Sequence, residues 1–138
     1  MICSVCKNLF TLSQKSVPVS GTPAELQTAA NLAETLRAHA AECIGMAANM
    51  IGVNQRIIAV GLGPAAFVML NPEIREKSGA FDTQEGCLSL EGTRPAKRYR
   101  SITVSWQDTA MQRHEQTFSG LLAQVIQHEC DHLDGILI

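Results

Sequence analysis

The chain has 138 residues, a net charge of −2 and a pI near 6.0, and 46% of its residues are hydrophobic. These values predict one domain, residues 1–138, with a substantial core. They show no excess of positive charge of the kind that indicates direct nucleic-acid binding. No apolar run reaches the roughly 18–20 residues of a membrane span, and the first ten residues lack a secretory pattern. We therefore expect a cytoplasmic protein whose five cysteines are thiols or metal ligands, not disulfides.

The first element that the sequence predicts is a helix from about residue 22 to residue 42. Thr22, Pro23 and Glu25 combine a capping box with proline at the first helical position. A mainly apolar face then continues at helical spacing through Leu26, Ala29, Ala30, Ala33, Leu36 and Ala40. Glycines at positions 45 and 52 end this pattern before the β-rich part of the chain.

The middle of the chain predicts several short strands. Apolar and β-branched residues gather in two runs, at residues 57–60 and 67–70, and a further strand is predicted at the more polar residues 73–77; a turn is predicted at residues 61–64. Residues 98–106 alternate between apolar and polar side chains, and residues 112–118 would return as their hairpin partner. The basic residues of this region fit either a solvated strand face or contact with an acidic partner; they are Arg94, Lys97, Arg98 and Arg100.

A second helix is predicted near the end of the sequence. Ser119 is a candidate N-cap, Gly135 marks the end, and one apolar stripe runs through Leu121, Leu122, Val125, Ile126 and Leu133. Strands gathered between two helices predict an α+β fold with antiparallel pairing.

The segment QHECDHLDG, residues 127–135, carries the clearest chemical signal. His128 and His132 lie four residues apart on the predicted helix, so both imidazoles project from one face. This H-E-x-x-H spacing is typical of a divalent-metal site, with Glu129 placed to act as general base on the water that the metal activates. A surface helix with two unrelated histidines is the alternative, and the amphipathic, capped pattern disfavours it.

A catalytic metal site needs a third protein ligand. Only six residues follow His132, so we expect this ligand upstream, which argues against an ordinary zinc peptidase. The candidates are one histidine and five cysteines: His114, Cys3, Cys6, Cys43, Cys130 and Cys87. Cys87 is favoured, because it lies in QEGCLSLEG next to Gly86 and Glu85, although a core cysteine remains the alternative for this position.

The pairing of EGCLS, residues 85–89, with QHECDHLDG resembles the peptide deformylases. The resemblance runs from about Ala29 to the end of the chain. It implies antiparallel sheets packed around a central C-terminal metal-binding helix, with an N-terminal helix. It also implies a hydrolase of protein biosynthesis that performs N-terminal processing by removing the formyl group from formyl-methionyl peptides. The cofactor would be one divalent ion, natively Fe²⁺ (iron), with zinc, Ni²⁺ or Co²⁺ as replacements.

The same resemblance implies a role for several residues. The metal ligands would be Cys87, His128 and His132, and Glu129 would shuttle protons. The backbone N–H of Leu88 would face the oxyanion. Glu85 would be structural and would pair with a basic residue such as Arg98. Gly45 and Gly86 would contact the backbone of the substrate.

The motif that departs from the family pattern is the first one, approximately G-x-G-L-A-A-x-Q. The corresponding segment of this chain is CIGMAANM, residues 43–50. In it, Met50 takes the position of the glutamine whose amide holds the oxyanion. A thioether cannot donate a hydrogen bond, and losing one oxyanion donor costs about 10²–10³ in kcat. The side chain of Asn49 should point away from the oxyanion. No geometric argument places the amides of Asn54 or Gln55 beside it. The alternative function is thus a deformylase-like metalloprotein that binds N-terminal peptides with weak or no catalysis.

The expected partner is an N-formyl-methionyl peptide, met at the ribosome. The resemblance implies neither a membrane nor a direct nucleic-acid contact. The short ending after the third motif marks a subclass within the family.

Overall fold

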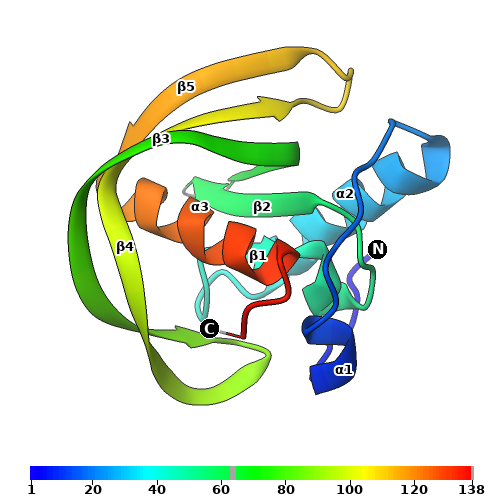
Figure 1. Cartoon of the computed structure of the whole chain (residues 1–138). Coiled ribbons are helices and arrows are strands. Elements are labelled where there is room, and N and C mark those ends of the chain that lie inside the picture. Colours follow the sequence, from blue (N-terminus) through cyan, green and yellow to red (C-terminus); the bar gives the residue numbers. More distant parts are fainter. Residues whose placement is uncertain (63–64, 138) are drawn as a thin grey trace.

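The computed structural model of the protein describes residues 1–62 and 65–137 (Figure 1). Its elements follow one another as α1 (Leu9–Leu12), α2 (Pro23–Ala38), β1 (Gly45–Ala47), the 3₁₀ helix η1 (Ala48–Ile51), β2 (Ile57–Leu62), β3 (Ala65–Cys87), β4 (Leu90–Gln107), β5 (Arg113–Ser119) and α3 (Gly120–Leu133). The fold is α+β, as the sequence predicts, with an N-terminal helix and a C-terminal helix around antiparallel strands.

The five strands form one antiparallel sheet in the order β1-β2-β3-β4-β5. The runs predicted at 67–70 and 73–77 belong to the single strand β3, whose pairing with β4 shifts between Leu70 and Glu73, between Ile74 and Glu76, and between Gly86 and Cys87. Such irregularities bend a strand and increase its twist. Accordingly, β3 and β4 curl around one side of α3 in Figure 1. The turn predicted at 61–64 lies partly outside the described residues, and its first two residues end β2.

Both predicted helices are present, with altered ends. The capping box at Thr22 and Glu25 is confirmed, because each side chain bonds the other's backbone N–H. Helix α2 ends at Ala38, four residues before the predicted end, since residues 40–42 are exposed and no packing extends it. Ser119 occupies the N-cap of α3, as predicted, but its side chain makes no capping hydrogen bond.

Strand β2 separates two hydrophobic cores. Because successive side chains of a strand point to opposite faces, Ile58 and Val60 pack into the core that contains α3. Ile57 and Ala59 pack into the core that contains α2. Helix α3, which carries the predicted metal-binding motif, therefore packs against one face of the sheet and buries its inner side chains.

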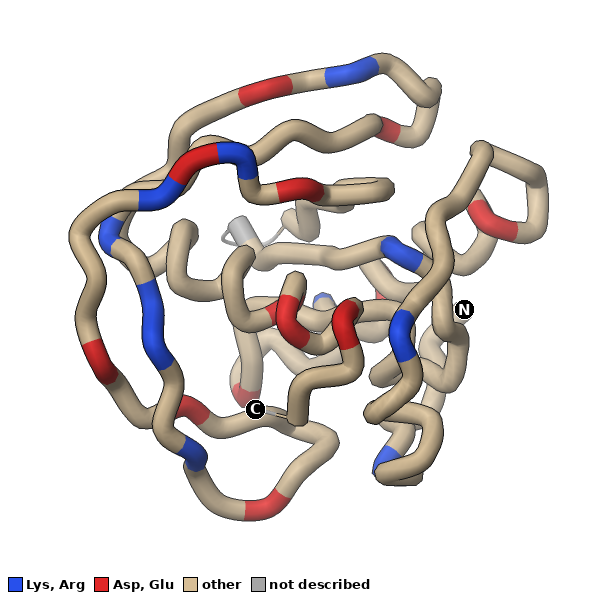
Figure 2. Tube along the Cα trace, viewed as in Figure 1, with Lys and Arg blue, Asp and Glu red and all other residues tan. Residues whose placement is uncertain are grey.

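The basic residues of β4 do not form one basic surface. Figure 2 shows acidic and basic positions interleaved along β3 and β4. Lys97 pairs across the strands with Asp82, and Arg98 is only 4% exposed. The solvated strand face therefore describes Lys97 and Arg100, which are exposed, but not the buried Arg98. Among the helices of the described residues, none has the length and apolar character required to span a membrane.

Candidate metal centre and catalytic pocket

Three side chains that the sequence singled out meet at one point. His128 and His132 are buried on α3, one turn apart, so their imidazoles project from the same face. Cys87, the last residue of β3, reaches them from the sheet. One ligand atom from each residue lies within 4.8 Å of the other two, an arrangement that could hold a metal ion.

The geometry of these ligand atoms fits a divalent ion. His128 Nε2 and His132 Nε2 are 3.1 Å apart. Two imidazole nitrogens bound to one tetrahedral ion at about 2.1 Å each would be roughly 3.4 Å apart. His128 Nδ1 is 2.8 Å from Glu85 Oε1, and because a carboxylate only accepts, Nδ1 carries the proton and Nε2 keeps its lone pair.

A buried ion-pair network holds Glu85 in place. Arg98 Nε donates to both carboxylate oxygens at 3.0 Å, and Arg98 Nη2 donates to Oε1 at 2.7 Å. Gln124 Nε2 donates to Oε2 at 2.8 Å, and Arg98 Nη1 also reaches Asp131 Oδ2 at 2.7 Å. Burial alone would raise the pKa of Glu85, but its hydrogen bonds, that from His128 included, lower it to about 2. The predicted pairing of Glu85 with Arg98 is confirmed.

Glu129 combines deep burial with an open hydrogen-bonding site. It is 4% exposed, and its Oε1 has no hydrogen-bond partner among the described residues. Burial raises the pKa of Glu129 to about 7, and the nearby carboxylate of Glu85 adds to the rise. A carboxyl whose pKa lies near neutrality has the property that a general base requires.

Gly45 is the residue that lets β1 approach α3. A Cβ atom at this position would lie 2.5 Å from Val125 Cγ1 and 2.8 Å from Glu129 Oε2. Any larger residue would therefore displace the candidate base. Gly86 differs, because a Cβ there would come no closer than 3.4 Å to Gly92 O, so packing within the chain does not require it.

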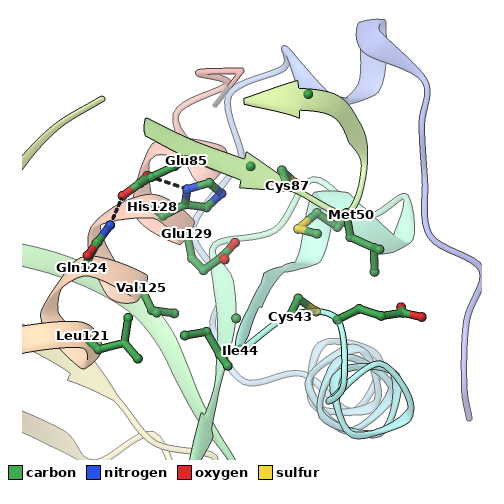
Figure 3. A pocket seen from close by; sticks show the side chains of 15 residues that line it. Cys43, Ile44, Met50, Glu85, Cys87, Leu121, Gln124, Val125, His128 and Glu129 are labelled. Carbon is green, nitrogen blue, oxygen red and sulfur yellow. Dashed lines mark hydrogen bonds and ion pairs between the residues drawn. The ribbon is translucent and has the colours of Figure 1, made fainter. Parts of the chain in front are cut away.

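A pocket of about 480 Å³ opens beside these groups (Figure 3). Its walls come from the segment around β1, from the β3–β4 hairpin and from α3; among its residues are Cys43, Ile44, Gly45, Met50, Gly86, Cys87, Leu88, Leu121, Gln124, Val125, His128 and Glu129. Burial raises the pKa of Cys43 to about 11, and the nearby charges of Glu129 and Cys87 add to the rise. Cys43 is thus a neutral thiol in the wall, outside the group of candidate ligands.

Met50 lies in the pocket wall, and neither Asn49 nor Asn54 supplies the amide that it lacks. It is 1% exposed, and its Sδ accepts from Ala47 N at 3.5 Å. Asn49 points away, as expected, since its Nδ2 donates to His132 O at 2.8 Å and to Leu12 O at 3.4 Å. The amide of Asn54 bonds Thr11 O, 3.0 Å away. These amides are therefore committed elsewhere.

Replacing Asn49 with alanine is expected to destabilise the protein by about 1–3 kcal/mol, because the buried carbonyls of Leu12 and His132 lose their donor. Guanidinium unfolding of the metal-free protein measures this change. Asn31→Ala is the control: its amide oxygen accepts surface bonds from Gln27 and Met1, so it should change stability by less than about 0.5 kcal/mol. Equal effects of the two substitutions would contradict the role given to Asn49.

The remaining candidate ligands lie elsewhere. His114 is exposed on β5 and bonds Asp108 Oδ2 at 2.7 Å. Cys130 is buried in the hydrophobic core, and the half-buried Cys3 and Cys6 do not belong to the metal-binding group found among the described residues.

Sequence reasoning missed Gln124 and Asp131, which complete the network around Glu85 and Arg98. The helical repeat could have indicated Gln124, because this residue lies four positions before His128 and so on the same face of the helix.

Comparison with known proteins gives one family. The sequence model described as polypeptide deformylase matches residues 2–138. A peptide deformylase of Clostridium beijerinckii is 42% identical over 138 residues, which cover 100% of both chains. A peptide deformylase of Thermodesulfovibrio yellowstonii is 39% identical over 134 residues, covering 92% of this chain and 80% of its own.

Solved structures of the same family share the fold. The peptide deformylase of Thermotoga maritima superposes with a TM-score of 0.88 at 29% identity, covering 99% of this chain and 95% of its own. A second solved structure is the class I type b peptide deformylase of Acinetobacter baumannii with Met-Ala-Ser bound. It superposes with a TM-score of 0.87 at 30% identity, covering 99% of this chain and 97% of its own.

Proposed function

The chain belongs to the polypeptide deformylase family, and on that premise we propose that Cys87, His128 and His132 hold the divalent ion of a peptide deformylase. Its reaction is removal of the formyl group from the N terminus of formyl-methionyl peptides. The observation that carries the assignment of ligands is the convergence of three ligand atoms within 4.8 Å at the wall of the pocket.

The thiolate and two imidazoles of this donor set suit Fe²⁺ or Zn²⁺. We propose Fe²⁺ as the native ion, with Zn²⁺, Ni²⁺ or Co²⁺ able to replace it. When bound, the ion supplies a Lewis acid that polarises the formyl carbonyl and lowers the pKa of the attacking water.

Glu129 acts as the proton carrier in this proposal. Its Oε1 has no partner among the described residues, so it can accept a hydrogen bond from water in the pocket. The carboxylate takes the proton of the water whose oxygen bonds the formyl carbon, and it later gives that proton to the amine nitrogen as the C–N bond breaks. The products are formate and a peptide with a free N terminus.

The pocket orients the substrate through backbone and wall contacts. Strand β1 lies at one end of the sheet order, so its second edge is unpaired among the strands of the described residues. An extended peptide can pair with such an edge, and Gly45 and Gly86 leave room for its backbone. The N–H of Leu88 is proposed to face the developing oxyanion. The peptide in the Acinetobacter baumannii structure, Met-Ala-Ser, is an example of the ligand class we propose.

Formate release tests the function. Protein loaded anaerobically with Fe²⁺ is expected to release one formate per peptide from formyl-Met-Ala-Ser. An enzymatic formate assay measures this, with metal-free protein as the control. Absence of formate above background, despite full occupancy by the metal, would contradict the activity.

Met50→Gln is expected to raise kcat, by up to about 10²–10³ if the new amide reaches the oxyanion well. The glutamine oxygen can accept from Ala47 N–H, as Met50 Sδ does, which leaves the amide N–H groups for the pocket. Steady-state kinetics of formate release measure the change, and Met50→Leu, which adds no donor, should not raise kcat. An unchanged kcat in Met50→Gln would mean that another group already supplies this hydrogen bond.

The proposed setting is the bacterial cytoplasm, where new chains carry the formyl group, and the substrate would be met at the ribosome. Residues 1–138 are proposed to act as one domain. The hydrophobic core around α2 supports this, since it draws on residues from Val5 to Leu137.

A further inference from the structure

The face of α3 that lines the pocket changes character along the helix. Leu121 and Val125 are apolar, and with Ile44 they make one apolar part of the wall. His128 belongs to the metal centre. Gln124 lies between the two parts, beside Glu85 (Figure 3). Gln124 and the apolar residues Leu121 and Val125 thus line the same pocket from one helix.

Glu85 fixes the orientation of that amide. Gln124 Nε2 lies 2.8 Å from Glu85 Oε2. Since an ionised carboxylate only accepts hydrogen bonds, the nitrogen of the amide must face it and the oxygen must face away. Arg98 in turn holds the carboxylate by three donor contacts of 2.7–3.0 Å. The amide is thus a rigid polar group on the wall.

One N–H of Gln124 remains unused. The amide nitrogen carries two hydrogens, and the bond to Glu85 engages one of them. Within the described part of the chain, Gln124 makes no other hydrogen bond, and its side chain is half-buried. The second N–H is therefore a donor available to a ligand in the pocket.

We propose that Gln124 is a specificity-determining residue, whose second N–H donates to the thioether of the substrate methionine and so favours methionine over an all-carbon side chain of the same shape. The inference rests on the proposed function, because it assumes that the first side chain of the peptide enters this pocket. A thioether sulfur is a weak acceptor, whereas the methylene of norleucine accepts nothing and leaves the N–H without a partner.

The test compares binding of Met-Ala-Ser and norleucine-Ala-Ser to Zn²⁺-loaded protein by calorimetry, which needs no turnover. The wild-type protein is expected to bind Met-Ala-Ser more tightly by about three- to tenfold, the value of a modest neutral hydrogen bond. In Gln124→Met, which keeps the length of the side chain and removes both N–H groups, the ratio should fall to about one. The ratio of kcat/KM for the two formylated peptides should change in the same way.

Two variants serve as controls. Gln116→Met makes the same chemical change on the exposed strand β5 and should keep the wild-type ratio. Gln124→Leu repeats the loss of the donor if Gln124→Met folds poorly, and the absorption of Co²⁺-loaded protein checks that each variant keeps its metal site. Equal affinities in the wild type, or a methionine preference that persists in both Gln124 variants, would overturn the inference. A wild type that binds neither tripeptide and releases no formate would instead refute the proposed function.

Discussion

Replacing Glu129 with alanine is expected to lower kcat for formate release by about 10²–10⁴, the contribution typical of a general acid–base group. The side chain is buried in the pocket wall, and its Oε1 has no hydrogen-bond partner among the described residues. Without this carboxyl, neither the water nor the departing amine has a proton carrier beside it. Steady-state assays at saturating formyl-Met-Ala-Ser measure kcat directly.

Glu129→Gln separates the chemistry from the packing. It keeps the shape of the side chain beside Gly45 but cannot take a proton, so it should be as inactive as alanine. Both variants should retain one metal ion per chain, because Glu129 is not in the candidate ligand group. Glu115→Ala on the exposed strand β5 is the matched control and should leave kcat unchanged. An active, metal-loaded Glu129→Gln protein would exclude the role proposed for this carboxyl.

Replacing Cys87 with alanine is expected to weaken metal binding by more than about 100-fold, because even residues that only orient ligands change affinity by 10–100-fold. The remaining donors would be His128 and His132, whose facing nitrogens are 3.1 Å apart, and two imidazoles hold a divalent ion weakly. Competition with a chromogenic chelator measures the affinity. The sulfur-to-metal absorption of the Co²⁺-loaded protein should also disappear.

The other cysteines provide the controls for this experiment. Cys3→Ala alters a half-buried residue near the amino terminus, outside the candidate ligand group, and should keep full metal occupancy. Cys43→Ala removes the neutral thiol of the pocket wall and should also keep the metal. Loss of stoichiometric binding in Cys3→Ala, with retention in Cys87→Ala, would show that the proposed ligand set is wrong.

The sequence predicted what depends on local rules. The capping box at Thr22 follows from residues three apart, and the placement of His128 and His132 on one helical face follows from the helical repeat. The antiparallel pairing of β4 with β5 follows from alternation on either side of a short turn. Strands between two helices predicted the α+β class, and family resemblance added their packing around the C-terminal helix, which the fold shows (Figure 1).

The tertiary structure decided what depends on distant contacts. Cys87 reaches the histidines because irregular pairing bends β3 around α3, and residues 67–70 and 73–77 gave no sign that they belong to one strand. Gly45 is required only because β1 packs against Val125 and Glu129, about eighty residues later in the chain. The bond between Gln124 and Glu85 spans 39 residues. Periodicity and capping act within a few residues, whereas these contacts exist only once the sheet has closed around the helix, so no local pattern encodes them.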